Sequence, residues 1–198
     1  MHITDELKLA LPVGDGSMMA YHTPISRDVY ELHYSVLNAA KAALVRKGVQ
    51  YQMGQGPHIA NLVLKDEGRN DAADRGKYDD KGNVVDEKTP ALLDEIKRLT
   101  VILAPAGAGY EMLPIDAAIA QGKIDSEDWS ELESAIVFFT CHVMPARKMN
   151  RVAIGKATAS VLNGSITSLS PMDFAASWQT LTKAESTPNP VATSSLPV

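Results

Sequence analysis

The sequence predicts a mainly α-helical, bundle-like domain with one β-hairpin near its N-terminus and a disordered C-terminal tail. Three observations support this fold class. Apolar residues recur at steps of three and four in most segments, which is the period of an amphipathic helix. A convincing alternation of apolar and other residues occurs only in residues 6–22. The chain has 198 residues, 45% hydrophobic and 22% charged, which fits one soluble globular domain.

The predicted hairpin spans residues 6–22. Apolar side chains alternate between Leu7 and Val13, Gly14-Asp15-Gly16 supplies the turn, and residues 18–21 return as the second strand. Pro12 cannot donate a backbone hydrogen bond to a neighbouring strand, so we expect it at a sheet edge. Because a lone hairpin is only marginally stable, it must pack on helices or extend another sheet.

Helices are expected in most of the remaining chain, because each apolar stripe is bounded by a capping residue, Gly or Pro. The strongest of these patterns begins at Asp125. The expected helices are 27–47; one opening at Pro57; one from Thr89-Pro90 with the stripe Leu92, Ile96, Leu99 and Leu103, ending at Pro105; 114–121; 125–145; 146–162; and a short last helix opening at Ser170.

Two stretches depart from helical periodicity. Residues 66–88 contain eight acidic and five basic residues, which predicts a frayed helix end and a solvated loop with a small turn at Asp80-Lys81-Gly82-Asn83. Residues 182–198 hold six Ser/Thr and three Pro, a composition typical of a flexible tail. We therefore expect a single domain over residues 1–181, followed by this tail.

The net charge of −5 argues against a protein that coats nucleic acid. One short basic stretch, with Arg147, Lys148, Arg151 and Lys156, lacks interleaved aromatic residues, so it is interpreted as a solvated helix face or a partner of the acidic loop.

No segment predicts a membrane anchor or a secretion signal. The most apolar window, residues 135–144, is too short to span a bilayer, which takes roughly 20 apolar residues. The N-terminal residues lack the pattern of a signal peptide, and the single cysteine, Cys141, excludes an internal disulfide framework. These features predict a cytoplasmic protein.

The search for catalytic, cofactor-binding and metal-binding residues yields no candidate. The Gly-x-Gly triplets at 14–16, 54–56 and 107–109 lack the continuation of a phosphate-binding loop, and the five histidines lack ligand spacing. The acidic loop offers oxygen ligands at a spacing that departs from a calcium loop: Asp79, Asp80, Asn83, Asp86 and Glu87. The sequence therefore predicts no enzyme and no cofactor.

The candidate partner-binding residues are Phe174, Trp178 and Leu181, which lie at helical spacing just before the predicted tail. Two interpretations stay open for this short amphipathic segment. It folds back on the core of its own chain, or it docks in a groove of a partner protein.

Several blocks of the sequence together resemble the tail assembly chaperones of long-tailed, lambda-like bacteriophages and prophages. The blocks are DELKLALPV, AYHTPISRDVYELHYSVLNAAKAAL, EIKRLTVILAP, DSEDWSELESAIVFFTCHVMPARK and SVLNGSITS, together with the Ser/Thr/Pro-rich end. The resemblance implies a non-enzymatic protein of the host cytoplasm that binds the tape measure protein and helps to recruit tail tube subunits. It also implies protein partners rather than nucleic acid or a membrane, and leaves a homo-oligomer open.

Two alternatives to a chaperone remain. A structural virion protein, such as a tail-completion or head–tail joining subunit, would use the N-terminal hairpin to extend a neighbour's sheet. A small enzyme would bring its catalytic residues together only in the folded chain, where a sequence motif does not reveal them.

Overall fold

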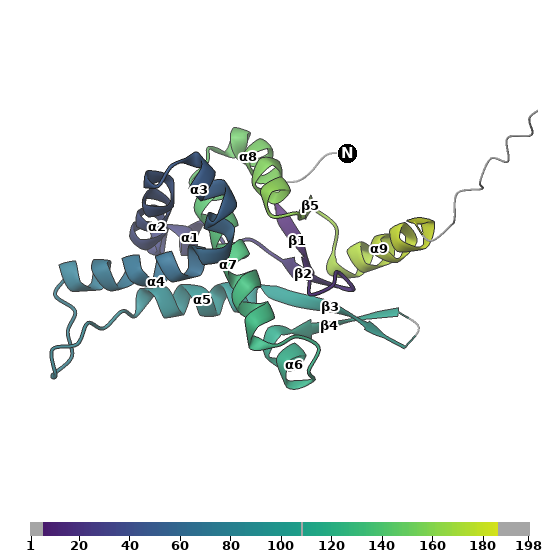
Figure 1. Ribbon diagram of the computed structural model, residues 1–198, viewed down its shortest axis with the longest axis horizontal. Helices are drawn as coiled ribbons and strands as arrows, with labels where there is room; N and C mark the ends of the chain where they lie inside the picture. Colours follow the sequence, from purple (N-terminus) through teal and green to yellow (C-terminus); the bar gives the residue numbers. More distant parts are fainter. Residues whose placement is uncertain (1–5, 108, 186–198) are drawn as a thin grey trace, which may run out of the picture.

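A computed structural model describes residues 6–107 and 109–185, with side chains described as far as residue 178. Within these ranges the chain is α+β, with nine helices and a five-stranded antiparallel sheet (Figure 1). The elements in chain order are β1 (Lys8–Val13), β2 (Met18–His22), α1 (Arg27–Leu32), α2 (Tyr34–Arg46), α3 (Val49–Gly54), α4 (Gly56–Asp74), α5 (Lys88–Arg98), β3 (Thr100–Ala106), β4 (Gly109–Pro114), α6 (Ile115–Ala120), α7 (Ser126–Val143), α8 (Lys148–Val161), β5 (Ser165–Thr167) and α9 (Pro171–Glu185).

The predicted N-terminal hairpin is confirmed as β1 and β2, and it forms the middle of the sheet. The strand order is β4-β3-β2-β1-β5, so each hairpin strand has a second neighbour within the chain. Pairing between β1 and β5 covers only Lys8–Ala10. Pro12 therefore lies on the half of β1 that β5 leaves unpaired, which agrees with its expected position at an edge.

The prediction that one helix continues to Pro105 is wrong. Helix α5 ends at Arg98, and Thr100–Ala106 forms β3, which pairs with β2 and β4. The spacing of Leu99 and Leu103 fits a helix, but Leu103 is buried against α9 whereas Ile102 is buried in the main core. A strand with both faces buried is a continuous apolar run, which periodicity cannot distinguish from a helix.

The helices of the first half depart from the prediction in three places. The expected helix 27–47 is two helices, because His33 (φ −103°, ψ 12°) departs from the helical conformation and caps both α1 and α2. Helix α3 was not predicted. Helix α4 continues to Asp74, so residues 66–74 are helical rather than frayed. The remaining loop closes through a Tyr78–Val84 bridge, and its turn begins at Asp79, one residue earlier than expected.

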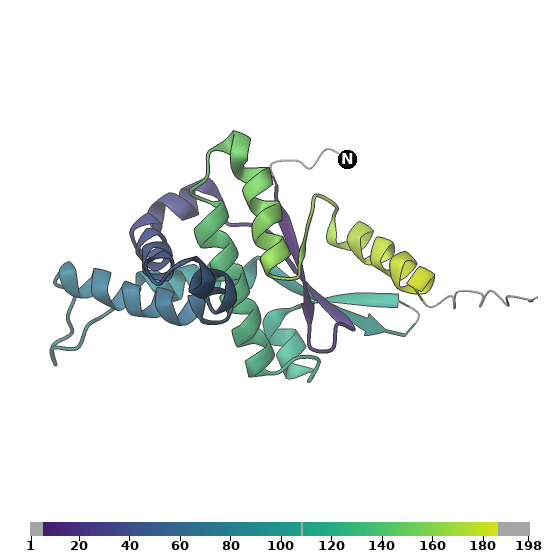
Figure 2. The ribbon, with the colours of Figure 1, turned by 45° about the horizontal axis from the view of Figure 1, so that its top comes forward.

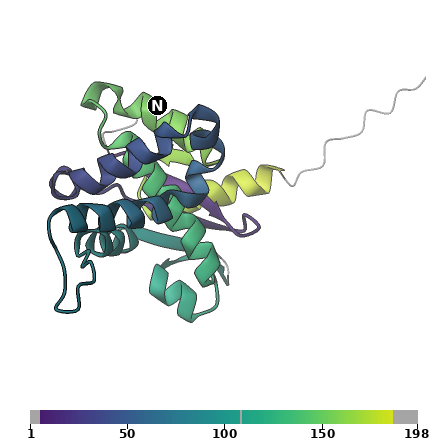
Figure 3. The same cartoon turned by 60° about the vertical axis from the view of Figure 1, so that its left-hand side comes forward.

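Helix α7 is the central element of the fold. Its predicted N-terminus is confirmed by a capping box, in which the Asp125 carboxylate accepts hydrogen bonds from two backbone N–H groups and Asp128 binds the Asp125 N–H. The middle of α7, from Ile136 to Phe139, is fully buried. Figures 1 and 3 show α7 between the helices α4 and α5 on one side and the sheet on the other.

The last helix is longer than expected. Ser170 and Asp173 form the predicted capping interaction at its start, since the Ser170 hydroxyl donates to the Asp173 carboxylate and accepts from the Asp173 N–H. Helix α9 then runs to Glu185, so the first residues of the predicted tail, 182–185, are helical. Residues 186–198 lie outside the described residues. Among the helices described, none is long and apolar enough to cross a membrane.

Candidate protein-binding site

The sheet has apolar side chains on both faces, and the second face is covered by α9. Alternate residues of a strand point to opposite faces. Ala20 and Ile102 therefore face the main core, whereas Tyr21 and Leu103 face α9 and form a separate buried cluster with Ala175. Figures 1 and 2 show α9 on the side of the sheet opposite α7.

Two of the three predicted partner-binding residues lie on this second face. The Phe174 ring centroid is 5.6 Å from that of Tyr21, and the Trp178 ring centroid is 4.9 Å from that of Tyr110. Leu181 belongs to α9 but its side chain lies outside the described ones. The described part of the stripe thus folds back on its own chain, and its use by a partner stays a prediction.

The attachment of α9 to the body is narrow. Residues 168–170 alone connect it to β5, and the Tyr21 hydroxyl donates a hydrogen bond to the carbonyl of Leu169 in this connection. Burial raises the pKa of Tyr21 to about 12, and Glu6 and Asp173 add to the effect. Met112 on β4 and Met172 on α9 are 41% and 60% exposed. Apolar surface therefore continues beyond the contact that α9 makes.

A depression lies between the turn of the β1–β2 hairpin, the α3–α4 junction, α7 and the end of α8. Its volume is about 190 Å³, below the range of 300–1,000 Å³ that small-molecule sites usually occupy. Its lining mixes apolar side chains with polar ones, among them Leu11, Met53, Leu132 and Leu162 with His58, Asp128 and Glu131. The depression is large enough for one protruding side chain of a partner.

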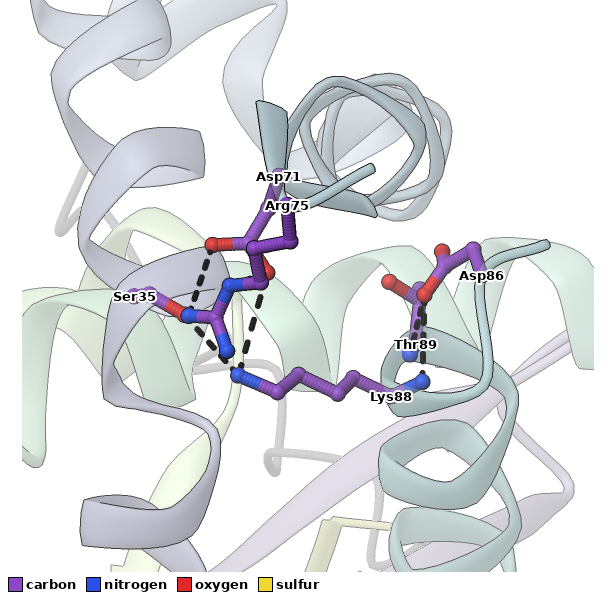
Figure 4. Close-up of polar contacts among 6 residues, drawn as sticks. All are labelled: Ser35, Asp71, Arg75, Asp86, Lys88 and Thr89. Carbon is purple, nitrogen blue, oxygen red and sulfur yellow. Dashed lines mark hydrogen bonds and ion pairs between the residues drawn. The ribbon is translucent and has the colours of Figure 1, made fainter. Parts of the chain in front are cut away.

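The most extensive charged cluster joins α2, α4 and the start of α5 (Figure 4). The Arg75 guanidinium donates to the Asp71 carboxylate at 3.0 Å and to the Ser35 hydroxyl at 3.2 Å. The Lys88 ammonium lies 3.7 Å from the same Asp71 carboxylate. Asp86 accepts hydrogen bonds from the first backbone N–H groups of α5. These contacts close the loop against the helices, which is a structural role.

Asp79, one of the loop carboxylates considered as calcium ligands, is engaged in turn formation. The Asp79 carboxylate accepts hydrogen bonds from the backbone of Lys81 and Asn83 and from the Asn83 side chain. The hydrogen bonds from Asn83 lower the pKa of Asp79. Within the described part of the chain, no three His, Cys, Asp or Glu residues are placed to hold a metal ion.

The most strongly shifted titratable groups are enclosed in the core. Burial lowers the pKa of His22 to about 3, and its Nδ1 lies 2.9 Å from the Thr100 hydroxyl. Burial also raises the pKa of the Cys141 thiol to about 12. Both side chains are fully buried, so neither is presented to a substrate at the surface.

Sequence reasoning missed the surface that receives α9. The alternation of Met19 and Tyr21 in the second strand was a usable signal for an apolar second face. Tyr110 carried no such signal, because its strand was not predicted. Comparisons of the chain with models of protein families, with curated proteins and with solved structures give no significant match.

Proposed function

We propose that the chain is a non-enzymatic tail assembly chaperone that binds the tape measure protein of a long-tailed bacteriophage in the host cytoplasm and helps to recruit tail tube subunits. The observation that carries the proposal is α9, an amphipathic helix that covers an apolar sheet face through Phe174 and Trp178. In this proposal α9 leaves the sheet and its stripe Phe174, Trp178 and Leu181 docks on apolar helices of the tape measure protein.

Physical reasons support α9 as the mobile element. An aromatic pair contributes roughly 0.5–1.5 kcal/mol beyond its area burial, and two such pairs link α9 to the sheet. This free energy is lost when α9 leaves the sheet. A partner with an apolar surface offsets the loss, because it covers the rings of α9 again. Trp and Tyr are also the residues that contribute most often to the strongest contacts of protein interfaces.

The resemblance of the sequence blocks supplies the identity of the partner. Long apolar helices, as a tape measure protein has them, aggregate unless their apolar faces are covered. The depression beside the turn of the β1–β2 hairpin suits such a partner too. Asp128 and Glu131 in its lining would attract basic residues that flank an apolar anchor.

The structural-subunit alternative is left with a short free edge in the hairpin. Strand β2 is paired on both sides over Met19–His22, whereas β5 pairs with β1 only over Lys8–Ala10, so in β1 only Leu11–Val13 offer an edge to a neighbour's sheet. Mass spectrometry of purified virions separates the two functions, because a chaperone is absent from the finished particle whereas a structural subunit is present in stoichiometric amounts.

Co-expression with the tape measure protein tests the proposal directly. We expect the wild-type chain to raise the soluble fraction of that protein, and the variant Phe174→Ala/Trp178→Ala to lose most of this gain. Met149→Ala is the matched control, because Met149 on α8 is 83% exposed and equally apolar. Circular dichroism verifies that each variant is folded. No gain in solubility with the wild type, or equal loss with Met149→Ala, would contradict the proposal.

A further inference from the structure

A second pocket, of opposite electrostatic character, lies between the start of β1, the segment 23–27 that leads into α1, and α8. Its volume is about 480 Å³, within the usual range of small-molecule sites. Three cationic side chains line it, namely Lys8, Arg27 and Arg151, and Glu6 is the one carboxylate in its lining. The lining therefore holds two more cations than carboxylates, although Arg27 is also paired with Glu31 on α1 and Lys8 with Glu6.

Arg151 is the least satisfied of these cations. One of its terminal nitrogens donates to the carbonyl of Ala146 at 3.3 Å, whereas its Nε is buried and lacks a hydrogen-bond partner. Among the described residues, no carboxylate forms an ion pair with Arg151. A buried N–H donor without an acceptor costs free energy. Arg151 lines the pocket, so its guanidinium retains hydrogen-bonding capacity for an oxyanion there.

Arg27 brings a second guanidinium to the same region. Its Nε donates to the Glu31 carboxylate at 2.7 Å, and its Cζ lies 5.0 Å from the ring centroid of Tyr30. Burial and then Tyr34 raise the pKa of Tyr30, whereas Arg27 and Arg151 both lower it. Both guanidiniums therefore lie within electrostatic range of one phenol.

Lys8 contributes a third cation from β1. Its side chain is only 19% exposed and lies 2.9 Å from the carboxylate of Glu6, which is 62% exposed. Because the Glu6 carboxylate is exposed to solvent, an anion that enters the pocket competes with it for Lys8.

We propose that this pocket binds the oxyanion group, phosphate or carboxylate, of a small-molecule ligand. Guanidinium groups bind such groups with two parallel hydrogen bonds, and Lys8 adds a point charge. Leu7, Ile25 and Met144 complete the lining with apolar groups. The proposal uses no residue of α9 and is independent of the proposed chaperone function.

Isothermal titration calorimetry at fixed ionic strength tests the site, with pyrophosphate and citrate as probes for the phosphate and carboxylate arms. We expect saturable binding of one of the two by the wild-type protein. Arg151→Gln should weaken binding at least tenfold, because it removes a charge-assisted hydrogen bond. Arg27→Gln should weaken it less, since the Arg27 side chain is 55% exposed.

The matched control is Arg46→Gln, which changes the net charge equally at an exposed position of α2 outside the pocket. Its binding should equal that of the wild type. The proposal is refuted if the wild type binds neither probe saturably, or if Arg46→Gln weakens binding as much as Arg151→Gln. If Arg151→Gln does not fold, Arg151→Lys keeps the charge but loses the planar fork, and unchanged affinity in that variant also refutes the assignment.

Discussion

Gly68 on α4 marks the closest approach between α4 and the start of α5, and Gly68→Ala tests this packing. A Cβ at this position would overlap the Thr89 hydroxyl and the Asp86 carboxylate, and it would lie 3.0 Å from the Thr89 Cβ. Overpacking of this kind costs about 1–3 kcal/mol, against a gain of about 1 kcal/mol from the higher helix propensity of Ala. We therefore expect Gly68→Ala to lower the free energy of unfolding by up to about 2 kcal/mol.

Urea and thermal denaturation followed by circular dichroism measure this effect. For a chain of this length the loss lowers the Tm by about 2–4 °C per kcal/mol. Gly54→Ala on α3 is the matched control: no heavy atom lies within 4 Å of its Cβ position, so stability should be unchanged or higher. Thr89→Ala should recover part of the loss in the double variant, because the Thr89 hydroxyl is buried without a hydrogen-bond partner. A Gly68→Ala variant as stable as Gly54→Ala would refute the reasoning.

Three further predictions concern pH, capping and thiol reactivity. Folding lowers the pKa of His22 from 6.5 to about 3, so the unfolded chain binds a proton that the folded chain does not. The free energy of unfolding should therefore fall as the pH drops from 6.5 towards 3, by roughly 3 kcal/mol at pH 4.5 from this residue. The urea midpoint of His22→Asn should depend less on pH across this range than that of the wild type. Asp125→Ala should lower the free energy of unfolding by about 1 kcal/mol through loss of the capping box, whereas Ser126→Ala should leave the urea midpoint nearly unchanged. Cys141 should react with an aromatic disulfide reagent only as fast as the chain unfolds, and rapid labelling of the folded protein would contradict its burial.

The helices with strong local signals were predictable from the sequence. The Asp125 and Asp128 pair set the start of α7, and Pro145 follows shortly after its end. The buried positions of α2, Val36, Leu37, Ala40 and Leu44, follow the helical period within the expected helix 27–47. Such features depend on residues three or four positions apart, so the local sequence contains the information that specifies them.

The sheet beyond the hairpin was not predictable in the same way. Strand β3 is specified by its pairing with Met19–His22, some 80 residues earlier, and β5 is only three residues long. Because a helix was expected over Thr100–Pro105, the partner strand of this segment, β4, which contains Tyr110, was not predicted either. The candidate site was therefore half predicted: Phe174 and Trp178 were identified from their helical spacing, whereas the rings that they contact were not.

The two proposed sites can be separated because they share no residue. The α9 stripe depends on Phe174 and Trp178 against the second face of the sheet, whereas the anion pocket depends on Arg151 and its neighbours on α1 and β1. Arg151→Gln is thus an additional control in the co-expression assay, and Phe174→Ala/Trp178→Ala in the calorimetry. Loss of both the solubility gain and anion binding in either variant would indicate a shared conformational change rather than two sites. Neither set of substitutions removes a contact of the other site.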